Sequence, residues 1–197
     1  MSFLAAAALA FGAIFVAEFG DKSQLLILAF ATRYPARPVI VGLVIAATVI
    51  QGLSVAVGAA VGAALPSTAV AIVGGIAFLA VAAWTLRGEE EDGSEAMAVG
   101  PRRRAGLGLV LAVAVTFILG ELGDKTMLAT FALAASQGPI PTWIGSTAGE
   151  VAANLLAVAA GRQVGHRLSP RLVRLGSAAL FALGGIVLLL SGVAGLA

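Results

Sequence analysis

Two short polar strings that could bind a cation interrupt an otherwise apolar chain of 197 residues. They are Glu18-Phe19-Gly20-Asp21-Lys22-Ser23 and, 103 positions later, Glu121-Leu122-Gly123-Asp124-Lys125-Thr126. Ionisable side chains are costly inside a bilayer, so a segment that keeps three of them is expected to use them. Both strings, called the motifs below, are therefore candidate parts of one ion-binding site.

The composition indicates an integral membrane protein. Hydrophobic residues make up 60% of the chain, charged residues make up 11%, and the mean hydropathy is +1.04, which lies outside the range of ordinary soluble domains. The chain has no cysteine and a single histidine, His166, so it cannot build a thiolate or histidine-rich metal centre. The arginines lie in short loops between apolar segments, which indicates membrane topology and argues against binding of nucleic acid.

Six apolar segments can each supply the roughly 20 residues that a spanning helix needs. They cover approximately residues 3–31, 39–65, 68–86, 105–136, 142–161 and 172–194. The first and fourth segments are too long for one straight span, and a motif lies near the middle of each. Tilting of these helices would absorb the excess length, and so would a break at Gly20 and Gly123. The sequence leaves both arrangements open.

A shift of the chain by 103 residues aligns its two halves without a gap. This register pairs Pro38 with Pro141, Gln51 with Asn154 and Phe78 with Phe181. We therefore predict two copies of a three-helix unit, at residues 1–88 and 105–197, joined by a charged cytoplasmic linker at residues 89–104.

The loop arginines predict that the two copies have opposite orientations in the membrane. A unit of three helices ends on the side opposite to its start, so the second copy enters from the other side. The predicted topology puts ten arginines on one face: Arg33, Arg37, Arg87, Arg102, Arg103, Arg104, Arg162, Arg167, Arg171 and Arg174. The positive-inside rule makes this face cytoplasmic and both termini external. The expected fold is an all-α integral membrane protein with six transmembrane helices as two inverted-topology three-helix repeats.

The acidic residues of both motifs are the expected metal ligands. Inverted symmetry should bring them together near the middle of the membrane, where they would form an all-oxygen set of Glu18, Asp21, Glu121, Asp124, Ser23 and Thr126. Such a set suits a hard divalent cation such as Mn²⁺ or Ca²⁺. With the two motif lysines the site carries a net charge of −2, which one divalent cation or two protons would neutralise. The site is therefore expected to exchange one for the other.

Further residues are expected to support the site or to couple it to protons. They are Lys22, Lys125, Gln51, Asn154, Glu150, Gly20 and Gly123. On a continuous helix, Glu18, Asp21 and Lys22 would share one face. Glu150 falls outside the repeat symmetry because the register pairs it with Ala47, so it is either a proton relay, an entry ligand or an interfacial residue. A purely structural alternative is that each motif forms an ion pair within its own helix, which would leave both aspartates and the duplication unexplained.

The paired signature E-x-G-D-[KR]-[ST] resembles that of the six-helix cation/proton antiporters of Golgi, chloroplast and bacterial membranes, a family linked to manganese and calcium homeostasis. The resemblance covers essentially the whole chain. It implies that the transport site comprises Glu18, Gly20, Asp21, Lys22 and Ser23 with Glu121, Gly123, Asp124, Lys125 and Thr126. It also implies a multi-pass protein of a prokaryotic inner membrane.

The expected function is export of Mn²⁺, and possible export of Ca²⁺, from the cytoplasm in exchange for protons. Ca²⁺/H⁺ exchange as the main activity, or a divalent-cation channel with the same site, are the alternatives. An enzyme is not expected because the chain has no nucleophile motif, histidine cluster or cofactor motif. The expected partners are the transported ions and the lipid bilayer, with no cofactor, and the sequence leaves the oligomeric state open.

Overall fold

The computed structural model describes residues 1–19, 21–87, 106–163 and 170–194, and the structural statements below concern these residues. Their regular structure is entirely helical, which confirms the all-α part of the predicted fold. The helices are α1 (Phe3–Glu18), α2 (Lys22–Arg33), α3 (Ala36–Ala64), α4 (Ser67–Arg87), α5 (Leu107–Glu121), α6 (Lys125–Gln137), α7 (Pro139–Gln163) and α8 (Pro170–Ala194). The predicted linker at residues 89–104 lies outside the described residues.

The two long apolar segments are each broken at their motif. The first consists of α1 and α2 and the second of α5 and α6, which bend by 78° at the break. Gly123 adopts a φ of 80°, which glycine accepts readily. Asp124 caps α6 by accepting a hydrogen bond from the backbone N–H of Thr126. The prediction that Glu18 and Asp21 share the face of one helix is therefore wrong, because α1 ends at Glu18.

Helix length and composition identify membrane-crossing candidates among the described residues. The helices α3 and α4 are long and apolar enough to cross a membrane, and the bent pair α5 and α6 would together make a third crossing. Prolines set the boundaries of the long helices: Pro35 precedes α3, and Pro66 separates α3 from α4. Six complete spans stay a prediction.

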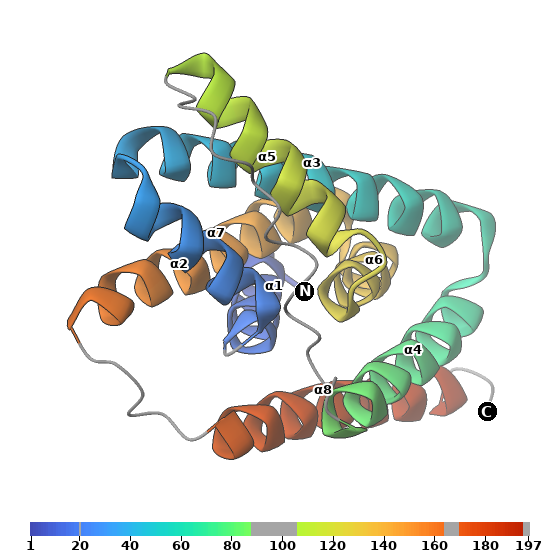
Figure 1. Ribbon diagram of the computed structural model, residues 1–197. Coiled ribbons are helices and arrows are strands. Elements are labelled where there is room, and N and C mark those ends of the chain that lie inside the picture. The colour runs from blue at the N-terminus through green and yellow to red at the C-terminus, as the bar shows by residue number, and fades with distance from the viewer. Residues whose placement is uncertain (20, 88–105, 164–169, 195–197) are drawn as a thin grey trace.

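Figure 1 shows α4 and α8 side by side along one edge, with α1 and α6 seen nearly end-on in the centre. The helix α7 packs closely against α1, and α3 packs against both α5 and α6. Two glycines on α7 fix its direction, because Gly145 lies against the carbonyl of Ala7 and Gly149 lies against that of Phe11. The helices α1 and α7 are therefore parallel and begin on the same side of the molecule.

Contacts between the two halves follow the 103-residue register. A Cβ added to Gly42 on α3 would lie 2.8 Å from the carbonyl oxygen of Val110 on α5. The counterpart of Gly42 is Gly145, and the counterpart of Val110 is Ala7, which Gly145 contacts in the same way. The register thus relates helix contacts in space as well as residues in the sequence.

The aromatic pair of Phe78 and Phe181 lies where the two halves meet. The register pairs these residues with each other, and their rings pack edge to face with centroids 5.5 Å apart. Both are buried in a cluster made mostly of alanine and other small apolar residues from α1, α4, α6 and α8. A residue that touches its own counterpart lies near the axis that would relate the two copies.

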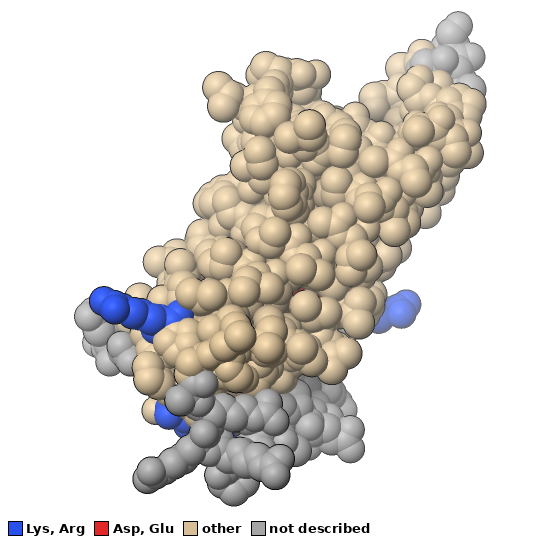
Figure 2. Space-filling view, turned by 90° about the horizontal axis from the view of Figure 1, so that it is seen from above, with Lys and Arg blue, Asp and Glu red and all other residues tan. Residues whose placement is uncertain are grey.

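The outer surface of the helices is apolar. Large exposed side chains such as Val41, Ile76, Leu119 and Leu190 point away from the core, as expected of helices that face lipid tails. On the face drawn in Figure 2, the coloured Lys and Arg side chains lie only in the lower half. The arginines whose side chains are described are all exposed, which agrees with a location at a membrane surface.

Candidate cation site

All five acidic side chains in the described part of the chain are buried. Their exposed fractions are 0% for Glu18, 7% for Asp21, 2% for Glu121, 3% for Asp124 and 1% for Glu150. Glu18 and Glu121 are the last residues of α1 and α5, and the two aspartates lie in the breaks that follow. The two broken segments and the middle of α7 thus bring the acids of both halves into the interior.

Three motif carboxylates converge. Glu18, Glu121 and Asp124 each offer one oxygen atom, and these atoms lie within 4.8 Å of one another. Oxygen ligands at 2.3–2.6 Å from a Ca²⁺ ion can be at most about 5 Å apart, so a cation could sit among these oxygens. Glu18 Oε1 and Glu121 Oε2 have no hydrogen-bond partner in the described structure. These buried oxygens are therefore available to a ligand.

The motif hydroxyls orient two of these carboxylates. Ser23 Oγ donates a hydrogen bond of 2.6 Å to Glu18 Oε2. Thr126 donates to Asp124 Oδ2 through its backbone N–H at 3.5 Å and its hydroxyl at 3.4 Å. Both hydroxyls were predicted as ligands, and in this structure each is a donor to a predicted ligand.

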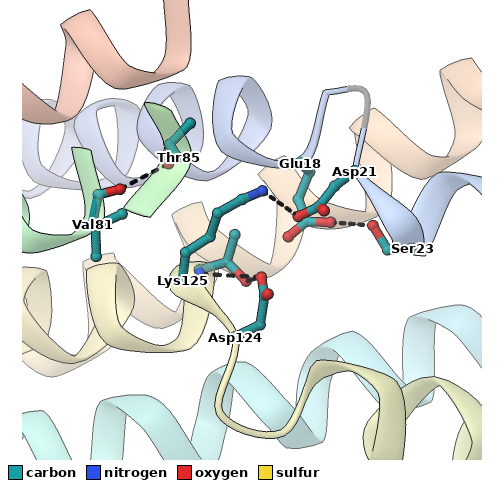
Figure 3. Close-up of polar contacts among 8 residues, drawn as sticks. Glu18, Asp21, Ser23, Val81, Thr85, Asp124 and Lys125 are labelled. Atoms are coloured by element: carbon teal, nitrogen blue, oxygen red, sulfur yellow. Dashed lines mark hydrogen bonds and ion pairs between the residues drawn. The ribbon is translucent and has the colours of Figure 1, made fainter. Parts of the chain in front are cut away.

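Lys125 links the two motifs. Its Nζ lies 2.7 Å from Oδ2 of Asp21, which belongs to the other half of the chain. Figure 3 shows the Lys125 side chain reaching from the start of α6 toward Asp21 and Glu18. The alternative of an ion pair between Lys125 and Glu121 within one helix is wrong, because the break turns Lys125 away from α5. Gly20 and the side chain of Lys22 lie outside the described structure.

Glu150 is buried inside the fold, with an exposed fraction of 1%, on the helix that packs against α1, and its depth in the membrane stays a prediction. Gln51 Nε2 donates a hydrogen bond of 2.5 Å to Glu150 Oε2, and Asn154 Nδ2 donates to the backbone carbonyl of Glu150 at 3.0 Å. The Glu150 charge acts electrostatically on both Glu18 and Glu121. Gln51 thus holds the Glu150 carboxylate. Glu150 is not one of the three converging carboxylates, and it has no acidic counterpart in the first half.

Two further buried polar residues on the helix of Glu150 were not among the predicted site residues. Thr142 and Ser146 lie on α7 and are 0% exposed. Thr142, Ser146 and Glu150 follow one another at intervals of four residues. This spacing is the signal that could have revealed them, because residues at this spacing share a helix face.

Comparisons with known proteins give a consistent assignment. The family model described as "Divalent cation/proton antiporter GDT1" matches residues 6–93 and 109–195. A Vibrio cholerae protein whose name proposes manganese export is 32% identical over 171 residues, which cover 85% of this chain and 82% of that protein. A GDT1-like protein of Synechocystis sp. is 33% identical over 190 residues, with coverage of 88% and 91%.

The relatives extend to plants. The chloroplastic protein PAM71 of Arabidopsis thaliana is 32% identical over 198 residues, which cover 87% of this chain and 53% of that protein. No solved structure matches the chain. The matched segments cover most of both halves, so the chain belongs to the GDT1 family of divalent cation/proton antiporters, which are membrane transporters and not enzymes.

Proposed function

We propose that the protein exports Mn²⁺ from the cytoplasm in exchange for protons, with Ca²⁺ as a second substrate. Glu18, Glu121 and Asp124 are the ligands of the transported ion in this proposal. The observation that carries it is the convergence of their three buried oxygens within 4.8 Å, at the breaks of two apolar segments. The name of the Vibrio cholerae relative supports manganese as the substrate.

The donor chemistry supports a hard divalent cation. Hydroxyls of Ser23 and Thr126 donate to Glu18 and Asp124, and carboxylate oxygens are the ligands that Ca²⁺ and Mn²⁺ prefer. The cluster is far from neutral when its carboxylates are ionised. Because a buried excess of negative charge is costly, the site is expected to hold either a cation or protons at any time. Because the cation and the protons cannot occupy the site together, movement of one in one direction is coupled to movement of the other in the opposite direction.

Two inverted copies of a three-helix unit, residues 1–88 and 105–197 around the 89–104 linker, are part of this proposal. The equivalent contacts of Gly42 and Gly145 support it, and so does the packing of Phe78 on Phe181. The family model also matches one stretch in each half. Exposed arginines such as Arg33 and Arg87 support a cytoplasmic location for the end of α2 and the end of α4.

In the transport cycle that we propose, the cluster opens to the cytoplasm, takes up the cation, and then opens to the outside. Lys125 and Asp21 join the two halves at the cluster, so the charge of an ion bound there acts on both halves. Release of the cation outside leaves carboxylates that take up protons, and the protons return the site to the cytoplasmic side. Alternating access of this kind requires relative movement of the two halves around a fixed central site.

Uptake by proteoliposomes with a preset pH gradient tests this function. Vesicles that contain the wild-type protein should accumulate Mn²⁺ in exchange for protons, with Ca²⁺ accumulated more slowly and Mg²⁺ excluded. The substitution Asp124→Asn keeps a residue that caps a helix well, so the fold should persist. It removes a ligand charge, and Mn²⁺ uptake should fall by roughly 10–100-fold.

The matched control is Thr85→Val, which changes a buried threonine on α4 whose hydroxyl donates to the carbonyl of Val81 at 2.8 Å (Figure 3). Uptake by this variant should equal that of the wild type. Full activity of Asp124→Asn would refute the site. Faster uptake of Ca²⁺ than of Mn²⁺ would make Ca²⁺ the main substrate, and a flux that ignores the pH gradient would indicate a channel.

A further inference from the structure

A row of buried polar side chains lies along one face of α7. Its members are four residues apart, which places them on the same face of a helix. The row consists of Thr142, Ser146, Glu150 and Asn154, with exposed fractions of 0%, 0%, 1% and 0%. Polar residues buried in this way within an apolar helix are costly, and in membrane proteins they mark paths for ions or protons.

The row is confined to the second half of the chain. The register pairs its members with residues of α3, in order Val39, Leu43, Ala47 and Gln51, all of them buried. Only the last position, Asn154 opposite Gln51, is polar in both halves. The first three positions are polar on α7 and apolar on α3, although Gly145 on α7 and Gly42 on α3 make equivalent helix contacts. A purely structural role common to both helices does not explain this difference.

The hydrogen-bonding capacity of the row is only partly used. Thr142 Oγ1, Glu150 Oε1 and Asn154 Oδ1 have no hydrogen-bond partner among the described residues. Ser146 Oγ donates to the carbonyl of Trp143 at 3.3 Å and keeps its capacity as an acceptor. Buried polar atoms without partners require an explanation, and bound water that bridges them is the common one.

The row leads from one side of the molecule to the acidic cluster. Because α7 runs parallel to α1, Thr142 lies toward the side where both helices begin, and Glu150 lies toward Glu18 at the end of α1. The eight residues from Thr142 to Glu150 span about 12 Å of helix. This length is close to half of the roughly 30 Å hydrocarbon core of a bilayer. In the proposed topology, in which α7 crosses the membrane, the row would cover most of the depth between the cluster and the outer side.

The groups that face Glu150 come from every helix packed on this part of α7. Gln51 on α3 donates to its carboxylate, and the charges of Glu18 at the end of α1 and Asp124 at the start of α6 interact with it. Gln24 on α2 donates to the carbonyl of Ala153, one helical turn further along α7. The Glu150 carboxylate is therefore held by the amide of Gln51, on a helix that packs against the segments carrying the proposed ligands.

We propose that Thr142, Ser146 and Glu150 form a proton path between the acidic cluster and the side on which α7 begins. This side is external in the proposed topology, so the inference rests on the proposed function. A proton from external water passes along water held by the two hydroxyls to Glu150 Oε1. Glu150 then transfers it to a cluster carboxylate that has released its cation, and a second external proton replaces it. The equivalent face of α3, with Val39, Leu43 and Ala47, offers no such path.

The double variant Thr142→Val with Ser146→Ala tests this path. Both changes nearly conserve shape and remove only the hydroxyls, so the fold should persist. Mn²⁺ uptake driven by a pH gradient should fall by about tenfold or more, as expected when a proton relay is lost. Exchange of Mn²⁺ for Mn²⁺ across the vesicle membrane without a gradient requires no net proton movement, and it should stay within about twofold of the wild type. Glu150→Gln should likewise lose gradient-driven Mn²⁺ uptake and keep Mn²⁺ exchange. The control is again Thr85→Val.

Two outcomes would overturn the path. One is gradient-driven uptake by the double variant within about twofold of the wild type. The other is an equal loss of gradient-driven uptake and of Mn²⁺ exchange, because the hydroxyls would then serve the metal ion or the fold. Failure of the proposed function is distinct, since wild-type vesicles would then show neither Mn²⁺ nor Ca²⁺ exchange. If Asp124→Asn abolishes exchange while the row variants behave as wild type, the site stands and the path is refuted.

Discussion

The substitution Gly145→Ala tests the close packing of α1 on α7, which sets the position of Glu18 relative to Glu150. A Cβ at Gly145 would lie 2.9 Å from the Cβ of Ala10, 3.0 Å from the carbonyl carbon of Ala7, and closer still to its oxygen. These are mainly backbone contacts, so the neighbour cannot turn away as a flexible side chain would. The two helices must separate to accept the methyl group.

The expected cost follows from two opposing effects. Overpacking of a well-packed contact costs about 1–3 kcal/mol, and at a backbone contact the upper part of this range applies. Replacement of glycine by alanine inside a helix returns roughly 0.5–1 kcal/mol. The free energy of unfolding should therefore fall by about 1–2 kcal/mol. Gly12→Ala on α1 is the matched control, because no heavy atom lies within 4 Å of the added Cβ, and it should be neutral or stabilising.

Thermal unfolding in detergent measures the difference. For a chain of this length, each kcal/mol corresponds to roughly 2–4 °C in Tm, so Gly145→Ala should unfold about 2–8 °C below the wild type. Gly42→Ala should behave alike, because its Cβ would lie 2.7 Å from Val113 Cβ and 2.8 Å from the Val110 oxygen. If Gly145→Ala is as stable as Gly12→Ala, the close approach of α1 and α7 is wrong.

Substitutions at two contacts test how the halves are joined. Lys125→Met removes the cation that pairs with Asp21 at 2.7 Å, and loss of one partner from a buried ion pair costs about 3–5 kcal/mol. Tm and Mn²⁺ uptake should both fall, and Lys125→Arg should recover part of the Tm. An unchanged Tm in Lys125→Met would contradict the ion pair. Phe78→Ala and Phe181→Ala should each lower the free energy of unfolding by about 3–5 kcal/mol. Because the two rings share one contact, the double variant should cost less than the sum in chemical unfolding, and strict additivity would show that they do not touch.

The general arrangement was predictable because it depends on composition and register. Apolar content predicts helices, and the 103-residue register predicts that the two motifs belong together. Four motif carboxylates were expected to meet; Glu18, Glu121 and Asp124 converge, whereas Asp21 pairs with Lys125. The break of both long segments was one of two open arrangements, because excess length in a helix can be absorbed by tilt or by a break.

The partners of the charged groups were not predictable. The 78° bend between α5 and α6 directs Lys125 toward Asp21 of the other half, and helical spacing instead suggested Glu121. Sequence spacing describes neighbours on a continuous helix, and it fails where the helix ends between the two residues. Thr142 and Ser146 were not predicted for another reason. An internal repeat draws attention to positions that agree between the halves, and the counterparts of these two residues, Val39 and Leu43, are apolar.

The contact between Phe78 and Phe181 bears on the ancestry of the chain. If both halves descend from one three-helix unit, that unit worked as two identical chains inserted in opposite directions, and its phenylalanine touched its own copy. In such a pair every substitution appears on both sides at once, so inner and outer surfaces must be alike. Fusion into a single chain removes this constraint, and Glu150 opposite Ala47 is a difference that a pair of identical chains cannot carry. Duplication followed by fusion thus allows an exchanger to treat the two sides of its membrane differently.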